Sequence, residues 1–317
     1  MNYLFFILLS IFIACILVIG NMIVVPPPKS IPTLESISEP FDMVDFSKIP
    51  EIQHYTARDG SKLAYREYPN QPAKQIVILV HGSSGSSWQM HPLAEYLQKQ
   101  GMTVYSLDMR GHGNSGRKGD IEYIGQLEDD LEDFDNQVLK HQKSTLVGFS
   151  LGGGFVLRFA ASKRQTLFSR YILLSPYMGY NSPTLKPNNG GWAEMSYSRY
   201  IGILLLGPVG ERVFGNLPVI TFATNPKAQH LTSQYSFRLL RNFGPDLDYK
   251  SDIASIKQPL KVLIGEKDEL WYPHAFPSLF KKLKAGIKVI IVPNAGHITL
   301  TTSLSGITAI AKAIVGD

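Results

Sequence analysis

The pentapeptide GFSLG at 148–152 places a serine between an apolar run, 144–148, and a segment with helical spacing, 151–161. A G-x-S-x-G pattern between a strand and a helix is typical of a nucleophile elbow, in which a tight turn holds the serine in a strained backbone conformation. The flanking glycines remove side chains that would collide, and the helix dipole behind the serine favours developing negative charge. We therefore predict Ser150 as a nucleophile. The alternative is an ordinary serine at a glycine-rich helix start.

A serine hydroxyl needs a base at neutral pH, and the base needs an acid that orients it. In this arrangement the acid and then the histidine follow the serine, each just after a later strand. The apolar runs 261–265 and 288–293 read as such strands, and Asp268 and His297 follow them. We predict Asp268 as the acid and His297 as the base. Two rival acids share the first loop, Glu266 and Glu269.

An acyl-transfer site also needs two backbone N–H groups for the oxyanion of the tetrahedral intermediate. One is expected from Leu151, the residue after the nucleophile. The second is expected from the loop HGSSG at 81–85, which follows the apolar run 76–80. We predict the amide of Ser83, with Ser84 as the alternative, because the neighbouring glycine lets this backbone approach a substrate closely.

This chemistry requires neither a metal nor an organic cofactor, and we predict none. The single cysteine, Cys15, excludes an internal disulfide and a cysteine-based zinc site. Acidic residues crowd 128–135, around an apolar helical stripe, and we expect them to form a solvated face rather than a metal site. His81 and His112 lie in glycine-flanked loops, where structural roles are expected.

The elements that must position these residues alternate short apolar runs with amphipathic ones after residue 50. This alternation predicts an α/β fold with a mostly parallel sheet and helices on both faces. Asp59-Gly60 predicts an antiparallel hairpin between 52–57 and 62–68. Further buried strands are expected at 76–80, 103–107, 145–149, 171–175, 260–264 and 287–292. The interval from 177 to about 255 interrupts the pattern with glycine, proline, asparagine and aromatic residues, which indicates a cap over one end of the sheet.

Composition sets outer limits on function. Of the 317 residues 44% are hydrophobic and 18% charged, which provides a real core and excludes a disordered chain. The formal net charge of +5 comes without a dense stripe of lysine and arginine, so we expect no nucleic-acid partner.

The N-terminus predicts a membrane anchor. Residues Leu4–Val25 carry no charge, and as a helix they would be roughly 33 Å long, enough to cross a hydrocarbon core of about 30 Å. The alternative is a cleaved signal peptide, which fits less well because no lysine or arginine precedes the apolar stretch. The flanking charges favour only slightly a domain on the exoplasmic side. Residues 26–50, rich in proline, are expected to form an unpacked tether.

Three segments narrow the interpretation, DMRGHGNS at 108–115, YIGQLEDD at 123–130 and GFSLGG at 148–153. With them the chain resembles the α/β-hydrolase superfamily, and within it the monoacylglycerol lipase, lysophospholipase and serine aminopeptidase-like group. The resemblance covers 51–317 and leaves the anchor, 1–25, and the tether outside it.

The resemblance implies Ser150 as nucleophile, Asp268 as acid and His297 as base, the same roles that their positions after the strands predict. It also implies that Asp108 and Arg110 belong to a structural loop. We expect a serine hydrolase that cleaves carboxylic esters through an acyl-enzyme, and the apolar cap beside an anchor favours a monoacylglycerol- or lysophospholipid-like substrate. The alternatives are an amide or peptide hydrolase of the serine aminopeptidase type, and a non-catalytic binding protein on a hydrolase scaffold.

Overall fold

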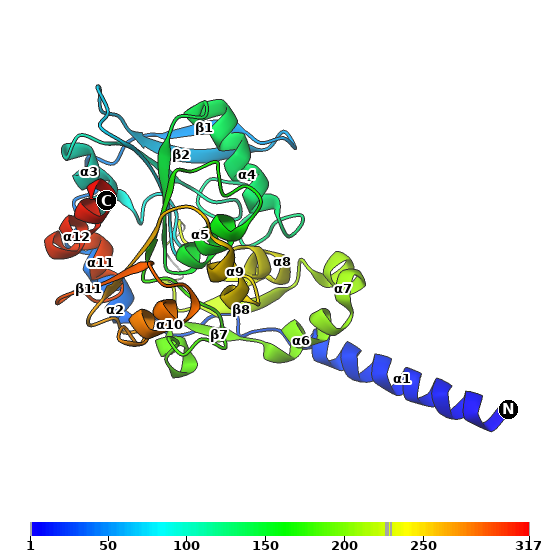
Figure 1. Cartoon of the computed structure of the whole chain (residues 1–317). Coiled ribbons are helices and arrows are strands. Elements are labelled where there is room, and N and C mark those ends of the chain that lie inside the picture. Colours follow the sequence, from blue (N-terminus) through cyan, green and yellow to red (C-terminus); the bar gives the residue numbers. More distant parts are fainter. Residues whose placement is uncertain (1, 226–227, 229, 317) are drawn as a thin grey trace.

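The computed structural model describes residues 2–225, 228 and 230–316, and within them the chain builds one central sheet of eight strands (Figure 1). The strand order is β1-β2-β4-β3-β5-β6-β10-β11; β2 is antiparallel to both of its neighbours, β1 and β4, and all other neighbouring strands pair in parallel. The strands are β1 (Ile52–Thr56), β2 (Lys62–Tyr68), β3 (Ile76–Val80), β4 (Thr103–Leu107), β5 (Ser144–Phe149), β6 (Arg170–Leu174), β10 (Leu260–Gly265) and β11 (Lys288–Val292). The predicted mostly parallel α/β architecture is confirmed.

The register of the parallel strands brings the chemistry-bearing loops to one edge. Val80 pairs with Leu107 on one side and with Gly148 on the other, so β3, β4 and β5 end at the same level. Residues 77–80 are completely buried, as expected for a strand covered on both faces. The loops that follow these carboxyl ends therefore converge, and this is where α/β sheets bind ligands.

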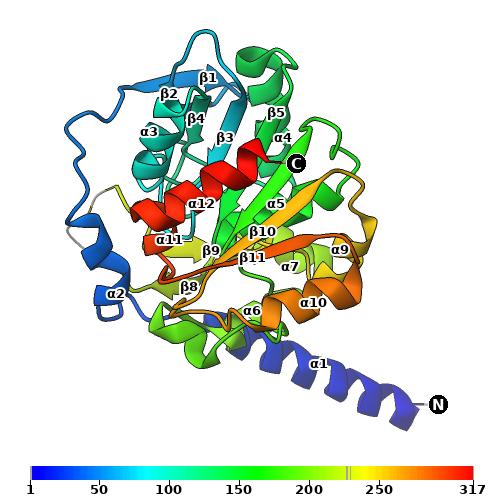
Figure 2. The same cartoon turned by 60° about the vertical axis from the view of Figure 1, so that its left-hand side comes forward.

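Helices cover both faces of the sheet (Figures 1 and 2). On one face lie α3, α11 and α12, and on the other α4, α5 and α9, with α10 against α9 and β11. Their bounds are α3 (His91–Lys99), α4 (Gln126–Phe134), α5 (Leu151–Ala161), α9 (Tyr249–Ser255), α10 (Ala275–Leu283), α11 (Thr299–Thr302) and α12 (Leu304–Val315). A π-helical segment, η2 (Asp135–Leu139), continues α4.

The acidic helix α4 differs from the solvated face that we expected. Its apolar stripe is buried as predicted, but Glu128, Asp130 and Asp133 are buried as well. Asp130 pairs with Arg110, with 2.7 Å between Oδ1 and Nη2. Glu128 and Asp133 similarly meet arginines from distant segments. Because each carboxylate has a cationic partner, the helix can bury this side instead of exposing it.

The cap consists of a small antiparallel sheet in the order β7-β8-β9 and short helices. Its elements are η3 (Pro187–Gly191), β7 (Ala193–Met195), α6 (Tyr197–Leu205), α7 (Gly207–Phe214), β8 (Pro218–Phe222), β9 (Gln234–Ser236) and α8 (Phe237–Asn242). The last helix of the interval that we assigned to the cap, α9, packs on α5 of the main domain instead.

At the N-terminus, α1 (Asn2–Val24) projects from the body beside α6 (Figure 1). Among the described residues it is the one helix long and apolar enough to cross a membrane. Residues 3–18 of α1 are exposed, and near its end Ile19 is partly buried and Ile23 fully buried against the cap.

A buried arginine ties the end of this helix to the cap. Arg199 of α6 donates from Nε to the carbonyl of Ile23 (2.7 Å) and from Nη2 to that of Val24 (3.3 Å). Ser196 donates to the carbonyl of Val25 (2.7 Å). The last carbonyls of a helix lack partners within it, so these side chains cap α1 and fix its direction relative to the cap.

Residues 26–50 pack against the domain, in contrast to the free tether that we expected. They contain α2 (Glu35–Ser38) and the 3₁₀ turn η1 (Glu39–Phe41). Ile37 belongs to the main core, and the Phe46 ring stacks on Trp88 with 4.1 Å between centroids. The carbonyl of Pro28 accepts a hydrogen bond from Gln234 of the cap (3.0 Å). Apolar residues spaced between the prolines provide these contacts, and composition alone does not show them.

Candidate functional site

Ser150 stands on the turn between β5 and α5, with φ 55° and ψ −120°, a conformation that a non-glycine residue rarely adopts. The flanking glycines are required by space. A Cβ on Gly148 would lie 2.4 Å from the carbonyl oxygen of Gly152, and one on Gly152 would lie 2.1 Å from that of His81. The G-x-S-x-G spacing is therefore a packing requirement of this turn.

The structure brings the three predicted side chains, Ser150, His297 and Asp268, into one chain of hydrogen bonds. His297 Nε2 lies 3.0 Å from the Oγ of Ser150, and its Nδ1 lies 2.9 Å from Oδ2 of Asp268. All three residues are at most 5% exposed. With the ring proton on Nδ1, where Asp268 accepts it, Nε2 presents its lone pair to the serine hydroxyl. This arrangement suits removal of the serine proton.

The surroundings hold the imidazole and the carboxylate in place. Oδ1 of Asp268 accepts hydrogen bonds from the amides of Leu270 (2.9 Å) and Trp271 (3.0 Å). The rings of Phe149 and Trp271 lie against the His297 ring, at 4.9 and 5.5 Å between centroids. One carboxylate oxygen is thus held by backbone while the other faces the histidine.

The two rival acids bind backbone instead of the ring. Glu269 accepts a hydrogen bond from the amide of His297 (2.6 Å), and Glu266 accepts one from the amide of Asn294 (3.1 Å). Both carboxylates therefore position the loop that carries the histidine. Asp268 is the acid that meets the imidazole.

The loop after β3 shows which amides can face a substrate. The amide of Gly82 donates to Gln89 (2.8 Å), and that of Ser84 donates to the hydroxyl of Tyr235 (2.6 Å). Ser84, our alternative donor, is therefore engaged. No hydrogen bond within the described part of the chain uses the amides of Ser83 and Leu151.

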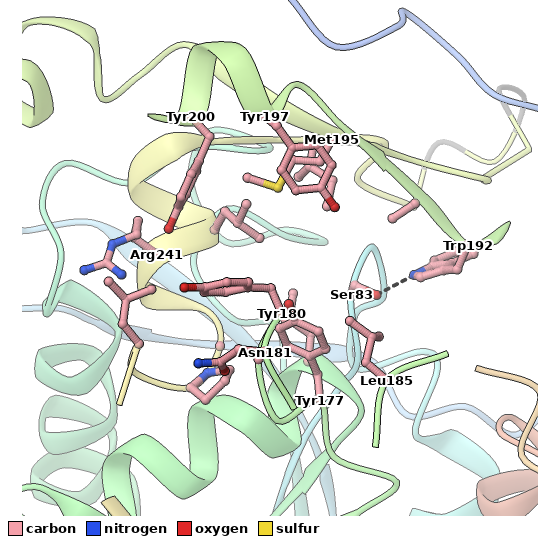
Figure 3. Close-up of a pocket in the computed structure, with 18 of the residues that line it drawn as sticks. Ser83, Tyr177, Tyr180, Asn181, Leu185, Trp192, Met195, Tyr197, Tyr200 and Arg241 are labelled. Atoms are coloured by element: carbon pink, nitrogen blue, oxygen red, sulfur yellow. Dashed lines mark hydrogen bonds between the residues drawn. The ribbon is translucent and has the colours of Figure 1, made fainter. Parts of the chain in front are cut away.

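Three cap residues that sequence reasoning missed hold this loop. Trp192 donates from Nε1 to the Oγ of Ser83 (2.7 Å; Figure 3). The amide of Thr232 donates to the carbonyl of Ser84 (2.9 Å), whose own amide is bound by Tyr235. These residues lie in the cap, where no local motif links them to residues 81–85, so the sequence offered no signal for them.

A cavity of about 380 Å³ opens above the serine. Ser83, Ser150 and Leu151 form part of its wall, and most of the remainder is apolar or aromatic. These apolar and aromatic side chains include Tyr177, Leu185, Trp192, Met195, Ile220, Phe222, Leu240 and Trp271. Such a cavity suits an apolar acyl group next to the serine hydroxyl.

The loop after β4 is structural, as the resemblance implied. Asp108 accepts hydrogen bonds from the amides of Ser87 (2.7 Å) and Asn114 (2.8 Å). Arg110 pairs with Asp130, and burial raises the pKa of the Asp130 carboxyl to about 6 despite that arginine. No group of three or more metal-ligating side chains lies together in the part of the chain that the structure describes.

The buried imidazoles of His81 and His112 are held neutral. His81 Nε2 accepts the amide proton of Met109 (3.2 Å), so Nδ1 carries the ring proton and donates to the carbonyl of Gly82 (2.7 Å). Burial lowers the pKa of His81 to about 4, and it lowers the pKa of His112 well below its usual value. Both histidines therefore shape the site without exchanging protons near neutrality.

The eight-stranded sheet and the serine on its strand–helix turn define an α/β-hydrolase. The serine aminopeptidase S33 family matches residues 71–302, which is more than half of the chain, and the chain belongs to this family. A monoacylglycerol lipase of Mycolicibacterium smegmatis is 26% identical over 228 residues, 67% of this chain and 76% of that protein.

Solved structures show the same fold. The monoacylglycerol lipase of Paleococcus ferrophilus superposes with a TM-score of 0.59 at 23% identity, covering 80% of this chain and 98% of that one. A soluble variant of the Saccharomyces cerevisiae monoglyceride lipase, bound to a substrate analog, superposes with a TM-score of 0.63 at 19% identity and covers 85% of this chain and 96% of that one. The protein is thus a hydrolase of the monoacylglycerol lipase and serine aminopeptidase-like group.

The neutral His81 predicts a pH-dependent stability. Unfolded histidine binds a proton near pH 6.5, but His81 in the folded protein does so only near pH 4. The unfolded state therefore binds more protons between these values, and the contribution of His81 is complete above pH 6.5 and falls as the pH decreases, by at most about 1.4 kcal/mol per pH unit. Denaturant unfolding at a series of pH values measures it.

Asp130 has a raised pKa in the folded protein, so its contribution to stability rises as the pH decreases, opposite to that of His81. The pH dependence of wild type is therefore compared with that of variants. His81→Gln, which cannot titrate, should lose less stability than wild type on acidification. Replacing the exposed His54 by Asn should leave the wild-type slope unchanged. Equal slopes for His81→Gln and wild type would show that His81 titrates normally in the folded protein.

Proposed function

We propose that this protein is a serine hydrolase that cleaves carboxylic esters through an acyl-enzyme. The observation that carries the proposal is the hydrogen-bonded series Ser150–His297–Asp268 in the wall of an apolar cavity. The comparisons support a lipase- or esterase-type hydrolase, and the roles of individual residues are our assignment.

In the proposed mechanism, Oγ of Ser150 attacks the ester carbonyl while His297 Nε2 takes its proton. The amides of Ser83 and Leu151 donate to the oxyanion, since neither has an acceptor among the described residues and both line the cavity together with Ser150. The imidazolium, stabilised by Asp268, then protonates the departing alcohol. A water molecule, deprotonated by the same nitrogen, attacks the acyl-enzyme and releases the acid.

An acyl or lipid-like ester is the proposed substrate class. The cavity next to Ser150 is largely apolar, so it favours transfer of an acyl chain from water. The relatives named as monoacylglycerol lipases support the same class. Amide or peptide bonds could be cleaved by the same side chains, and the family description names an aminopeptidase, so the first experiment includes such substrates.

We also propose that α1 anchors the domain to a membrane. The exposed apolar residues Ile201, Leu204, Leu205, Val209 and Val213 lie on α6 and α7, next to the point where α1 leaves the body (Figure 1). Arg199 fixes the direction of α1 there. Ile201 and Leu204 also line the cavity, so its mouth would face the lipid surface.

The role of Ser150 as nucleophile is tested by removing its hydroxyl. Ser150→Ala should lower ester turnover by a factor on the order of 10⁶ and abolish labelling by a fluorophosphonate, because no other group can form the acyl-enzyme. Hydrolysis of p-nitrophenyl esters of increasing chain length, beside aminoacyl and peptide amides, measures this. A sharp optimum at acetate would contradict the lipid assignment, and cleavage of amides alone would replace the ester assignment.

The role of Asp268 is tested by replacing it and, as a control, the neighbouring Glu269, each by its amide. Asp268→Asn should lower kcat by about 10⁴, because an amide no longer fixes the histidine tautomer. Glu269→Gln should retain kcat within about tenfold, because Glu269 accepts a hydrogen bond from the backbone amide of His297 and not from its ring, and a glutamine side-chain oxygen can accept the same bond. Steady-state kinetics on one ester, with thermal unfolding to confirm folding, checks both. An equal loss in the two variants would mean that Asp268 acts only by holding the loop.

The anchor is tested on the full chain in isolated membranes. Wild type should stay in the membrane pellet after alkaline carbonate extraction, and mass spectrometry should find its N-terminus intact. Replacing Leu9 and Ile13 by arginine should release it, because each charge in the helix centre costs about 3 kcal/mol. The same change at the exposed Met43 is the control. A mature N-terminus beyond α1 would identify a cleaved signal sequence instead.

A further inference from the structure

One cation in the cavity wall lacks a partner. Arg241 of α8 lines the cavity, and no hydrogen bond or ion pair within the described residues engages its guanidinium. Its Nε is buried and unsatisfied. Burying a charged donor without an acceptor is costly, so the position favours a bound group that can accept hydrogen bonds.

Three other arginines whose side chains are at most 14% exposed differ from Arg241 in having an acidic partner. Arg110 pairs with Asp130, Arg158 with Glu128, and Arg238 with Asp120. Each of them meets a carboxylate in the folded chain. None of the carboxylates in the described part of the chain pairs with Arg241.

Asp246, the one acid among the described residues that line the cavity, is already engaged. Asp246 also lines the cavity, and its carboxylate is paired with Arg158. The backbone carbonyl of Arg241 accepts a further hydrogen bond from the same Arg158 (3.4 Å). The negative charge of Asp246 is therefore directed at Arg158, and Arg241 has no acidic partner among the residues that the structure describes.

Polar groups gather around Arg241 at the side of the cavity opposite Ser83 (Figure 3). The hydroxyls of Tyr180 and Tyr200 point toward the guanidinium, and the amide of Asn181 lies below them. Tyr180 is 68% exposed, so this end is the mouth of the cavity. The cavity is thus apolar near the serine and rich in hydrogen-bond donors at its mouth.

We propose that this mouth binds the phosphate of the substrate, so that the preferred ester is a monoacyl lipid with a phosphate-bearing head group and not an uncharged glycerol ester. A guanidinium presents parallel N–H donors that match phosphate oxygens, and the tyrosine hydroxyls supply further donors. The acyl chain then occupies the apolar part beside Ser150. The inference rests on the proposed ester hydrolysis and names its substrate class.

The experiment compares two esters with the same octanoyl chain, one on glycerol and one on glycerol phosphate, at concentrations where both are monomeric. Release of octanoate gives kcat/KM for full-length wild type, Arg241→Gln and Arg241→Lys. Arg212→Gln is the matched control, because Arg212 lies exposed on α7 outside the cavity. Labelling by a fluorophosphonate confirms that each variant is folded.

Wild type should prefer the phosphate ester. Arg241→Gln should lose about 10- to 100-fold on that ester and less than about threefold on the uncharged one, the range expected for a charge-assisted hydrogen bond. Arg241→Lys should lose less, because it keeps the charge without the planar fork. Arg212→Gln should match wild type on both esters.

Two results would overturn the inference. One is a ratio of kcat/KM for the phosphate ester to kcat/KM for the glycerol ester that is the same in wild type and Arg241→Gln. The other is inhibition of p-nitrophenyl octanoate hydrolysis by inorganic phosphate at the concentration of the phosphate ester, which would assign the site to free phosphate. If p-nitrophenyl octanoate is not hydrolysed and the probe does not label wild type, the proposed function itself fails, and the two failures are thereby separated.

Discussion

The structure depends on the close approach of two backbones where β3 and β5 end side by side. The loop at His81 and the first turn of α5 at Gly152 lie so near each other that even a methyl group at Gly152 would collide with the His81 carbonyl. This contact places Ser150 and the amide of Ser83 on either side of one small volume. The histidine and its acid then have to reach that volume from β10 and β11, and the parallel register brings them there. A site of this kind is rigid because it is built where buried strands end.

The cap does more than cover this site. Trp192, Thr232 and Tyr235 each hold Ser83 or Ser84, so the loop that is proposed to stabilise the oxyanion takes part of its shape from the cap. A displacement of the cap would therefore disturb the geometry of catalysis together with access to the cavity. The hydroxyl of Tyr235 also contacts the buried His112, which links the cap to the structural loop after β4. The cap therefore influences both which substrate enters the cavity and the shape of the loop proposed to stabilise the oxyanion.

Arginine side chains join segments that are far apart in the sequence and that hydrophobic packing alone would hold together less firmly. Arg110 pairs with Asp130 and Arg158 with Glu128, which permits the burial of these acids of α4, and Arg199 joins α1 to the cap through carbonyl oxygens. In each case the charge is satisfied inside the folded chain. Among the described residues Arg241, in the wall of the cavity, has no such partner, and we propose that its partner is a ligand.

The sequence by itself determined the elbow, the strand-end acid and histidine, the alternating α/β plan and the apolar N-terminal helix. These features are encoded in short segments, because a tight turn, a doubly buried strand or a membrane-length helix each restricts neighbouring residue types. The structure separated Asp268, the acid that the sequence favoured, from its rival Glu269, and tertiary packing alone decided that Glu128, Asp130 and Asp133 of α4 are buried and that residues 26–50 pack on the domain. It also decided which cap residues hold the Ser83–Ser84 loop. Those outcomes depend on partners more than seventy residues away in several cases, such as Tyr55 and Asp130, and local spacing carries no information about which distant surfaces will meet.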